Sequence, residues 1–352
     1  MKKILVAMLV LVIIMSITSC SNPSSETTAT TTNTESAANE STPQQDTVVD
    51  RAWLEGKTIT IVMGFKAGGS LDVMVRQLIP FWQETAKCTF VVENRVGANG
   101  QLSSQHVLWQ PKDATTLLAY TETYQSNMYV SQNPGFGIDD FSIINMQVVD
   151  PATLTVLKDS PYQTIEALIK AIQDNPGQIT CANIQGSAGN ILLEILKEEY
   201  KLDFKTVTYE GGADMRTALL GKHVDFMAGT ASGDLGLGDS AMPLVVVGDK
   251  RNDIWPDTPC TTEAWPKLDV PLSLGSSRII ALPAEAKKNH PERFLALVET
   301  YKEALENPEY LKMRQDNGTE AVTHFYGPEE SDALQRSLFE FVEKYKDALS
   351  AN

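Results

Sequence analysis

One local pattern recurs along the chain and constrains its possible folds more than any other feature. In this pattern, a short apolar stretch runs into a glycine-rich turn, and residues with helical periodicity follow the turn. Thr58–Phe65 is apolar and β-branched, Ala67–Ser70 interrupts it, and apolar residues then recur at helical spacing over Leu71–Trp82. Similar glycine turns occur at Gln185–Asn190 and Tyr209–Asp214. Because strands alternate with helices, the sequence predicts an α/β fold with mainly parallel sheets flanked by helices.

The pattern starts again after Asp150, which predicts two lobes. Ala152–Leu157 is an expected strand, and Ile179–Asn183 is another that runs into one of the glycine turns. A late strand is expected at Ser277–Leu282, and the rest of the chain has helical periodicity. Two such blocks fit two α/β lobes.

The first residues have the pattern of a bacterial lipoprotein signal. Lys2 and Lys3 precede an apolar run that is too short for a comfortable membrane span, and Ile17–Cys20 resembles a lipobox. We expect residues 1–20 to be the signal, with Cys20 as the lipidated residue. Residues 21–50 are rich in Ser, Thr and acids, without an aromatic residue, and are expected to be a disordered linker.

Charge and composition exclude several classes of function. The chain of 352 residues has 29 Lys and Arg against 45 Asp and Glu, a net charge of −16. Nucleic-acid binding needs a basic surface, so no nucleic-acid partner is expected. No His or Cys residues have metal-ligand spacing, and no metal or other cofactor is expected. Of Cys88, Cys181 and Cys260, one must be unpaired in a monomer, and buried free thiols are the simplest interpretation.

The glycine turns are the candidate binding chemistry. Open α/β sheets bind ligands at the carboxyl ends of their strands. Glycine lets the backbone approach a ligand closely, and the N–H groups and dipole at a helix start favour an anion. Turns of this kind in two lobes would form a carboxylate site based on backbone and hydroxyl donors, although each turn alone is weak support.

The chain also resembles a known family, the extracytoplasmic solute-binding receptors of tripartite tricarboxylate transporters, also called Bug-type or TctC-like receptors. The most specific segment is Val92–Gly100 (VENRVGANG). Two departures are Lys66, where the family usually has proline, and Glu210, where it usually has lysine. The matching segments are Thr60–Asp72, Val91–Gly100, Gly186–Asn190, Val207–Ala213, Leu220–Met227 and Pro256–Glu263.

The resemblance implies a two-lobed clamshell of the periplasmic-binding-protein type, similar to type II. Lobe 1 would be residues 51–151 plus 275–352, and lobe 2 would be residues 152–274. The implied contacts to ligand carboxylates come from the first turn and its support: Gly68, Gly69, Ser70, Asp72, Asn94 and Ala98. The opposite wall would be formed by Thr121, Ser187, Asn190, Tyr209, Gly229, Thr230 and Ala231. Asp72 has an alternative role, stabilising the start of its helix.

Two further residues depart from the family pattern. Arg278 stands where an aromatic residue is common, and is a candidate counter-charge for a second ligand carboxylate or else a member of a salt bridge. Glu122 follows the third strand, where small polar residues are usual, and would bind an ammonium or hydroxyl group if it points into the cleft.

We therefore expect a monomeric lipoprotein, anchored to the cell membrane on its outer side, that binds a small organic di- or tricarboxylate or related anion and delivers it to membrane permease subunits. A receptor that presents its ligand to a sensor kinase is the alternative within the same fold. A secreted serine hydrolase using Ser187 is the alternative from another class, but Gln185 stands where a nucleophile elbow requires glycine. No catalytic residue is expected.

Overall fold

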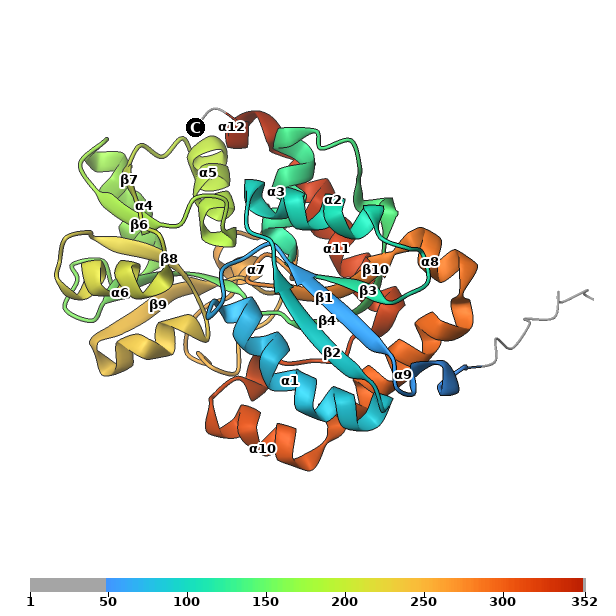
Figure 1. Ribbon diagram of the computed structural model, residues 1–352. Helices are drawn as coiled ribbons and strands as arrows, with labels where there is room; N and C mark the ends of the chain where they lie inside the picture. The colour runs from blue at the N-terminus through green and yellow to red at the C-terminus, as the bar shows by residue number, and fades with distance from the viewer. Residues whose placement is uncertain (1–48, 351–352) are drawn as a thin grey trace, which may run out of the picture. The chain divides into compact units, whose positions relative to one another are not determined.

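The computed structural model describes residues 49–350, which form two five-stranded sheets with helices packed on them (Figure 1). The predicted signal, Cys20 and the predicted linker up to residue 48 lie outside the described residues. Within residues 49–350, no helix has the length and apolar character needed to cross a bilayer.

The first sheet has the strand order β2-β1-β3-β10-β4. Strand β1 pairs in parallel with β2 and β3, whereas β10 runs antiparallel between β3 and β4. The strands are β1 (Thr58–Met63), β2 (Thr89–Asn94), β3 (Thr116–Thr121), β4 (Phe141–Val148) and β10 (Arg278–Pro283).

The second sheet repeats this plan with the order β7-β6-β8-β5-β9, in which β5 is the inverted strand between β8 and β9. The strands are β5 (Ala152–Leu157), β6 (Thr180–Asn183), β7 (Lys205–Thr208), β8 (Phe226–Thr230) and β9 (Ala241–Val246). The predicted α/β fold is confirmed, but both sheets are mixed. The inverted strands β5 and β10 are those that follow directly after the chain passes from one sheet to the other.

Helices cover both faces of the first sheet (Figure 1). Ile59 and Ile61 of β1 face the core that contains α1, whereas Val62 faces the core that contains Val107 of α2. The helices are α1 (Ser70–Ala86), α2 (Gln101–Trp109), α3 (Glu122–Gln132), α4 (Ile165–Asp174), α5 (Ala188–Tyr200), α6 (Gly212–Leu220), α7 (Thr261–Ala264), α8 (Ala284–Asn289), α9 (Pro291–Glu306), α10 (Pro308–Asp316), α11 (Gly327–Lys344) and α12 (Lys346–Ser350). Short 3-10 helices are η1 (Ala52–Leu54), η2 (Ala98–Gly100), η3 (Ile138–Asp140), η4 (Gly233–Ser240) and η5 (Glu320–Val322).

Helix α11 packs against both sheets. Its first half lies along β4, where Ser331 Oγ accepts a hydrogen bond from the N–H of Met146. Its second half contributes Leu338 and Phe341 to the core of the second sheet. The predicted lobe boundaries stay a prediction, but the last turns of the predicted lobe 1 also contribute to the core beneath the second sheet.

The sequence prediction missed β4 and α3. Strand β4 contains Asn145 and Gln147, which interrupt its apolar pattern but are buried because the C-terminal segment supplies partners: Asn145 Oδ1 accepts from the N–H of Tyr326, and Gln147 Nε2 donates to Tyr310 Oη. Helix α3 has a buried face that includes Glu122, Gln125 and Ser126, so it has no apolar stripe to detect.

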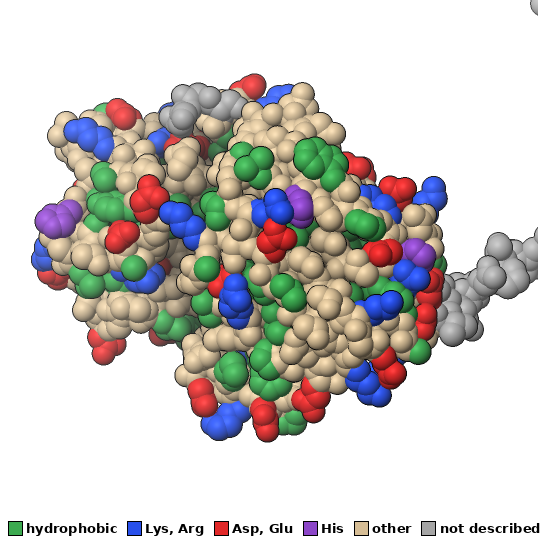
Figure 2. Space-filling view, viewed as in Figure 1, with side chains coloured by type: hydrophobic (Ala, Val, Ile, Leu, Met, Phe, Trp, Pro, Cys, Tyr) green, Lys and Arg blue, Asp and Glu red, His purple; other side chains and the backbone are tan. Residues whose placement is uncertain are grey.

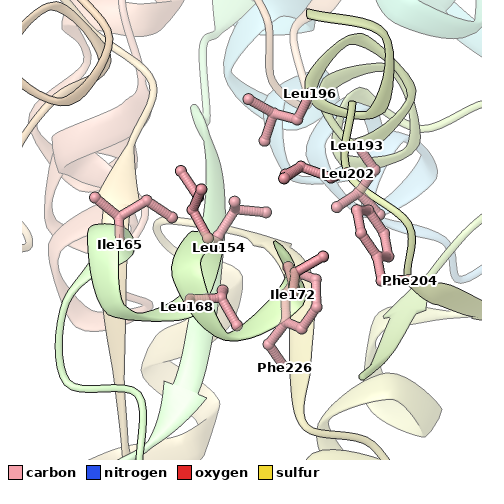
Figure 3. A pocket seen from close by; sticks show the side chains of 10 residues that line it. Leu154, Ile165, Leu168, Ile172, Leu193, Leu196, Leu202, Phe204 and Phe226 are labelled. Carbon is pink, nitrogen blue, oxygen red and sulfur yellow. The ribbon is translucent and has the colours of Figure 1, made fainter. Parts of the chain in front are cut away.

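The core of the second sheet contains a narrow space between α4, α5 and the strands, lined only by apolar side chains (Figure 3). Leu193 of α5 is fully buried beside this space, with Ile172 and Phe226 among the other lining residues. The space has no polar group that could orient a ligand, so we assign it to packing and place the binding site elsewhere.

Replacing Leu193→Ala should lower the free energy of unfolding by about 2–5 kcal/mol, because the change enlarges an existing gap in a tightly packed core. Leu220, which is 46% exposed at the end of α6, provides the matched control. Leu220→Ala should change stability by about 0.5 kcal/mol or less. Chemical denaturation measures both, and equal effects of the two substitutions would contradict the assignment.

Candidate functional site

The turn after β1 is built around a glycine with positive φ and an aspartate in the first turn of α1. Gly68 has a φ of 81°, and its N–H donates to Asp72 Oδ2 at 2.9 Å. Arg76 Nε donates to the same oxygen at 2.9 Å, and Asn94 Nδ2 donates to Asp72 Oδ1 at 3.1 Å. Burial raises the pKa of Asp72, but these bonds outweigh it and hold the pKa below its ordinary value. Both oxygens are thus engaged internally, which favours the organising role of Asp72.

Gly69 and Ser70, which follow Gly68 in this turn, are both exposed. Gly69 is the N-cap of α1, and the first N–H groups of a helix have no acceptor within the helix. Asn94 supports the turn from the end of β2, because its Nδ2 also donates to the carbonyl of Phe65 at 2.9 Å. The N–H of Gly69 donates to the carbonyl of Lys66 at 3.3 Å. The described contacts therefore place Asn94 behind the turn and leave the N–H of Ser70 open to an anion.

Ala98 lies in a second turn that presses against the end of β1. Ala98 has a φ of 47° although it is not glycine, and Gly100 has a φ of 96°. A Cβ placed on Gly64 would lie 2.6 Å from Gly100 Cα, so the two segments meet backbone to backbone. The exposed Ala98 is held in this strained conformation beside the first turn, as expected for a supporting loop.

The turn before α5 in the second sheet uses the same construction. Gly186 has a φ of 75°, and its N–H donates to Asn190 Oδ1 at 3.0 Å. Ser187 is the N-cap of α5, and its Oγ accepts from the N–H of Asn190 at 3.2 Å. In both turns, a glycine with positive φ donates to a side chain four residues later, so each sheet presents a helix start of the same kind.

Tyr124 of α3, which the sequence prediction missed, connects the two turns. Its ring packs edge-on against Phe65, with centroids 5.4 Å apart. On the other side, a Cβ placed on Gly186 would lie 3.5 Å from Tyr124 Cδ1 and 3.4 Å from Asn127 Nδ2. The Gly186 turn therefore contacts α3, and the ring of Tyr124 lies between the turns of the two sheets.

The chain crosses between the sheets twice, at 149–151 and 275–277, and these crossing segments are joined through Asp150. The carbonyl of Asp150 accepts from the N–H of Ser276 at 2.8 Å, and Pro151 forms an antiparallel bridge with Gly275. A Cβ on Gly275 would lie 2.2 Å from the Asp150 carbonyl oxygen, which explains the glycine. The Asp150 carboxylate accepts from the N–H of Ser232 at 2.8 Å and from Ser232 Oγ at 2.6 Å.

Arg278 begins β10 directly after the second crossing segment, beside Thr121 of β3 and Val148 of β4. Its Nη2 lies 3.4 Å from Ser276 Oγ, and its buried Nε has no hydrogen-bond partner among the described residues. Burial lowers the pKa of Arg278, opposed by the negative charge of Asp150. No described carboxylate forms an ion pair with Arg278, so the salt-bridge alternative is not supported within residues 49–350.

The residues predicted to form the opposite wall separate into two groups. Thr230 pairs with Ala152, and the N–H of Ala231 donates to the carbonyl of Pro151, so both lie beside the crossing segments. Gly229 instead faces the interior, because a Cβ there would lie 2.2 Å from Asp234 Oδ1. Tyr209 is half-buried at the end of β7, and its N–H donates to the carbonyl of Asn183.

Glu122 is fully buried at the start of α3, away from solvent. Ser126 Oγ donates to its Oε1 at 2.5 Å, and its Oε2 has no described partner. Burial raises the pKa of Glu122 from its ordinary value of 4.5 to about 8, although the bond from Ser126 lowers it. This burial favours an interior role over the predicted contact with a ligand.

The described residues give no support to a serine hydrolase or to a metal site. Ser187 Oγ is used as a helix cap, and no described histidine forms a hydrogen bond with it. Residues 49–350 contain no group of three His, Cys, Asp or Glu able to hold a metal ion. Cys88, Cys181 and Cys260 are free and buried. On the face shown in Figure 2, acidic and basic side chains of the described residues are interspersed rather than gathered into a basic patch.

Comparisons with known proteins identify the family and the fold. The family model described as "Tripartite tricarboxylate transporter family receptor" matches residues 74–335. A UPF0065 protein from Cupriavidus necator is 26% identical over 260 residues, which cover 72% of this chain and 76% of that protein.

Two solved structures from Rhodopseudomonas palustris share the fold. MatC with bound malate has a TM-score of 0.63 and 19% identity over 83% of this chain and 99% of its own. A protein with adipate has a TM-score of 0.65 and 20% identity over 83% of this chain and 97% of its own. Identities this low establish the fold alone.

Replacing Glu122→Gln should make stability less sensitive to pH. A carboxyl group whose pKa rises on folding stabilises the fold while protonated, so the wild type should lose stability as pH rises from about 4.5 to about 8. Between pH 6 and pH 9, the Tm of the wild type should fall by at least about 2 °C more than that of Glu122→Gln. Glu166→Gln, at an exposed position of α4, should follow the wild type. Identical pH profiles for all three proteins would show that Glu122 does not titrate in this way.

Proposed function

Because the chain belongs to the tripartite tricarboxylate transporter receptor family, whose model covers residues 74–335, we propose that it is an extracytoplasmic receptor for a small organic carboxylate. The receptor captures the carboxylate by closure of two lobes about the crossing segments and delivers it to a membrane permease. This is a binding role, and the proposal includes no catalytic step.

The observation that carries this proposal is the pair of matched turns. Gly68 with Asp72 in the first sheet and Gly186 with Asn190 in the second use the same hydrogen bond to hold a helix start. Tyr124 lies between the two turns, so a solute held there would contact both sheets. Helix starts and open backbone N–H groups favour a carboxylate, even in a protein body whose net charge is negative.

Direct ligand contacts are proposed for the open N–H of Ser70, for Ser187, and for Thr230 beside the crossing segments. Gly69 and Ala231 are given a supporting role, because their N–H groups already donate to the carbonyls of Lys66 and Pro151. The proposed role of Gly68, Asp72, Asn94, Ala98 and Asn190 is to hold these contacts in place. Thr121 adjoins Arg278 in the sheet register, and together they line the same part of the site.

Arg278 supplies the proposed charge for a second carboxylate. Its Nε is buried without a described partner, and an arginine fork suits bidentate carboxylate binding. The two Rhodopseudomonas palustris structures contain malate and adipate, both dicarboxylates. A dicarboxylate is therefore the ligand class that we propose for this chain.

The N-terminal pattern adds the proposed location. Lipidation at Cys20 and a linker up to residue 50 would tether the receptor to the outer side of the cell membrane. Labelling cells with a radioactive fatty acid tests the anchor. Label on the wild type that is lost in Cys20→Ser supports it, and an unlabelled wild type overturns it.

Calorimetric titration tests the binding proposal directly. Succinate, glutarate and adipate should include at least one ligand that binds with a Kd near or below about 1 μM, or about −8 kcal/mol. Arg278→Ala should weaken binding of that dicarboxylate by about tenfold or more, since a charge-assisted hydrogen bond contributes about 1.5–3 kcal/mol.

Two comparisons control this titration. Butyrate, which has one carboxylate, should lose much less affinity in Arg278→Ala than the dicarboxylate does. Arg251→Ala should bind like the wild type, because the exposed Arg251 already has a carboxylate partner in Glu263. If the wild type shows no saturable binding to any small organic anion, the proposed function is wrong. Equal losses for both ligands in Arg278→Ala would remove only the counter-charge role.

A further inference from the structure

The arginines of the chain divide into two groups by their partners. All nine lie within the described residues, and seven of them form an ion pair with Asp or Glu. The two that do not are Arg216 and Arg278. Neither is an ordinary exposed side chain, since both are partly buried. Arg278 Nε is buried without a described partner, whereas no nitrogen of Arg216 is both buried and unpartnered. Both guanidinium groups therefore lack a described carboxylate partner, and that of Arg216 stays accessible to an anion.

Arg216 lies on α6, and its side chain occupies a channel formed by glycines. A Cβ placed on Gly212 would lie 3.1 Å from Arg216 Nη1, and one placed on Gly236 would lie 3.2 Å from Nε. On Gly233, a Cβ would lie 3.8 Å from Nη1. Because these positions have no side chains, the guanidinium extends back along α6 toward its start and lies between that turn and η4.

This channel adjoins the junction of the two sheets. Gly233 follows Ser232, which donates two hydrogen bonds to the Asp150 carboxylate. Asp150 is also the acid whose charge acts on Arg278. The two arginines therefore flank the Asp150–Ser232 junction, with Arg278 at the start of β10 in the first sheet and Arg216 on α6, which packs against the second sheet.

The acids nearby do not neutralise Arg216. Asp234 is buried, and its Oδ2 accepts hydrogen bonds from Thr153 Oγ1 and Thr155 Oγ1. Burial raises the pKa of Asp234 to about 6, although these two hydroxyls and the charge of Arg216 lower it. Asp150 is occupied by Ser232 in the same way. Neither acid comes within ion-pair distance of Arg216, and no described residue forms a hydrogen bond with its guanidinium.

We propose that Arg216 is a second charged anion-binding residue of the receptor, so that one carboxylate of the ligand is bound at Arg278 and the other at Arg216 together with the backbone donors of the turns. This inference rests on the proposed function and narrows it, because it assigns a charged residue to each carboxylate of the proposed dicarboxylate, Arg278 in β10 and Arg216 on α6. The pairing also explains how a protein body with 40 acids and 27 basic residues, counted over residues 51–352, attracts such a ligand locally.

A matched pair of ligands tests the proposal: the dicarboxylate that binds best among succinate, glutarate and adipate, and its monomethyl ester. The ester keeps the length of the molecule and removes one charge. Arg216→Gln should weaken binding of the dicarboxylate by about tenfold or more and binding of the ester by at most about threefold. In the double variant Arg216→Gln with Arg278→Gln, the two ligands should bind with equal affinity, because the second charge no longer has a partner.

Control variants separate this role from folding and from net charge. Arg251→Gln removes the same charge from the second half of the chain and should leave both affinities unchanged. Arg216→Lys should keep part of the preference for the dicarboxylate. The Tm and circular dichroism spectrum of each variant show whether it folds, and if Arg216→Gln does not, the Arg216→Lys result decides.

The outcomes separate the proposed role of Arg216 from the proposed function of the protein. If the wild type binds the dicarboxylate and Arg216→Gln binds it equally well, the role of Arg216 is wrong and the proposed function stands. Equal affinity of the wild type for the dicarboxylate and its ester also overturns the dianion site. If the wild type binds no carboxylate, the proposed function itself fails, and this inference fails with it.

Discussion

The arrangement of the two sheets depends on the hydrogen bonds that Asp150 forms between them. Its carbonyl joins the two crossing segments through Ser276, and its carboxylate binds both the N–H and the hydroxyl of Ser232. The inverted strands β5 and β10 begin on either side of this junction, so one residue ties the first sheet, the second sheet and both connections together. Asp150 is 2% exposed, and its carboxylate accepts two hydrogen bonds, so its position is fixed. This fixed negative charge also orders the charged groups around it.

The proposed binding chemistry follows from this frame. Each sheet presents a glycine with positive φ before a helix, and each glycine is held by a side chain in the first turn of that helix. The ring of Tyr124 lies between these turns. Backbone donors alone would accept many anions, so discrimination between mono- and dianions requires charged side chains. Arg216 and Arg278, the two arginines without a described carboxylate partner, provide such a difference.

The sequence indicated the α/β fold and the glycine turns because both depend on local patterns. Gly68 and Gly186 could be identified since each breaks an apolar strand and precedes a helical stripe. Strand β4 was missed because the partners that make its buried Asn145 and Gln147 favourable lie near the end of the chain. Asp72 was placed correctly in the first turn of its helix, but its internal donors could not be identified from spacing. No local sequence pattern identifies Arg216. Its proposed role depends on the glycines of η4 that surround its guanidinium and on the lack of a described carboxylate partner, and neither can be inferred from neighbouring residues in the sequence.

The identity of the solute that the native protein carries after gentle purification tests the central claim most directly. Mass spectrometry of the small molecules released on unfolding should find an organic acid with two anionic groups, present in a stoichiometric amount and absent from a preparation of the Arg216→Gln, Arg278→Gln double variant. A stoichiometric neutral or cationic solute, such as a sugar or an amine, would contradict the claim that the junction between the two sheets is a site for a dianion.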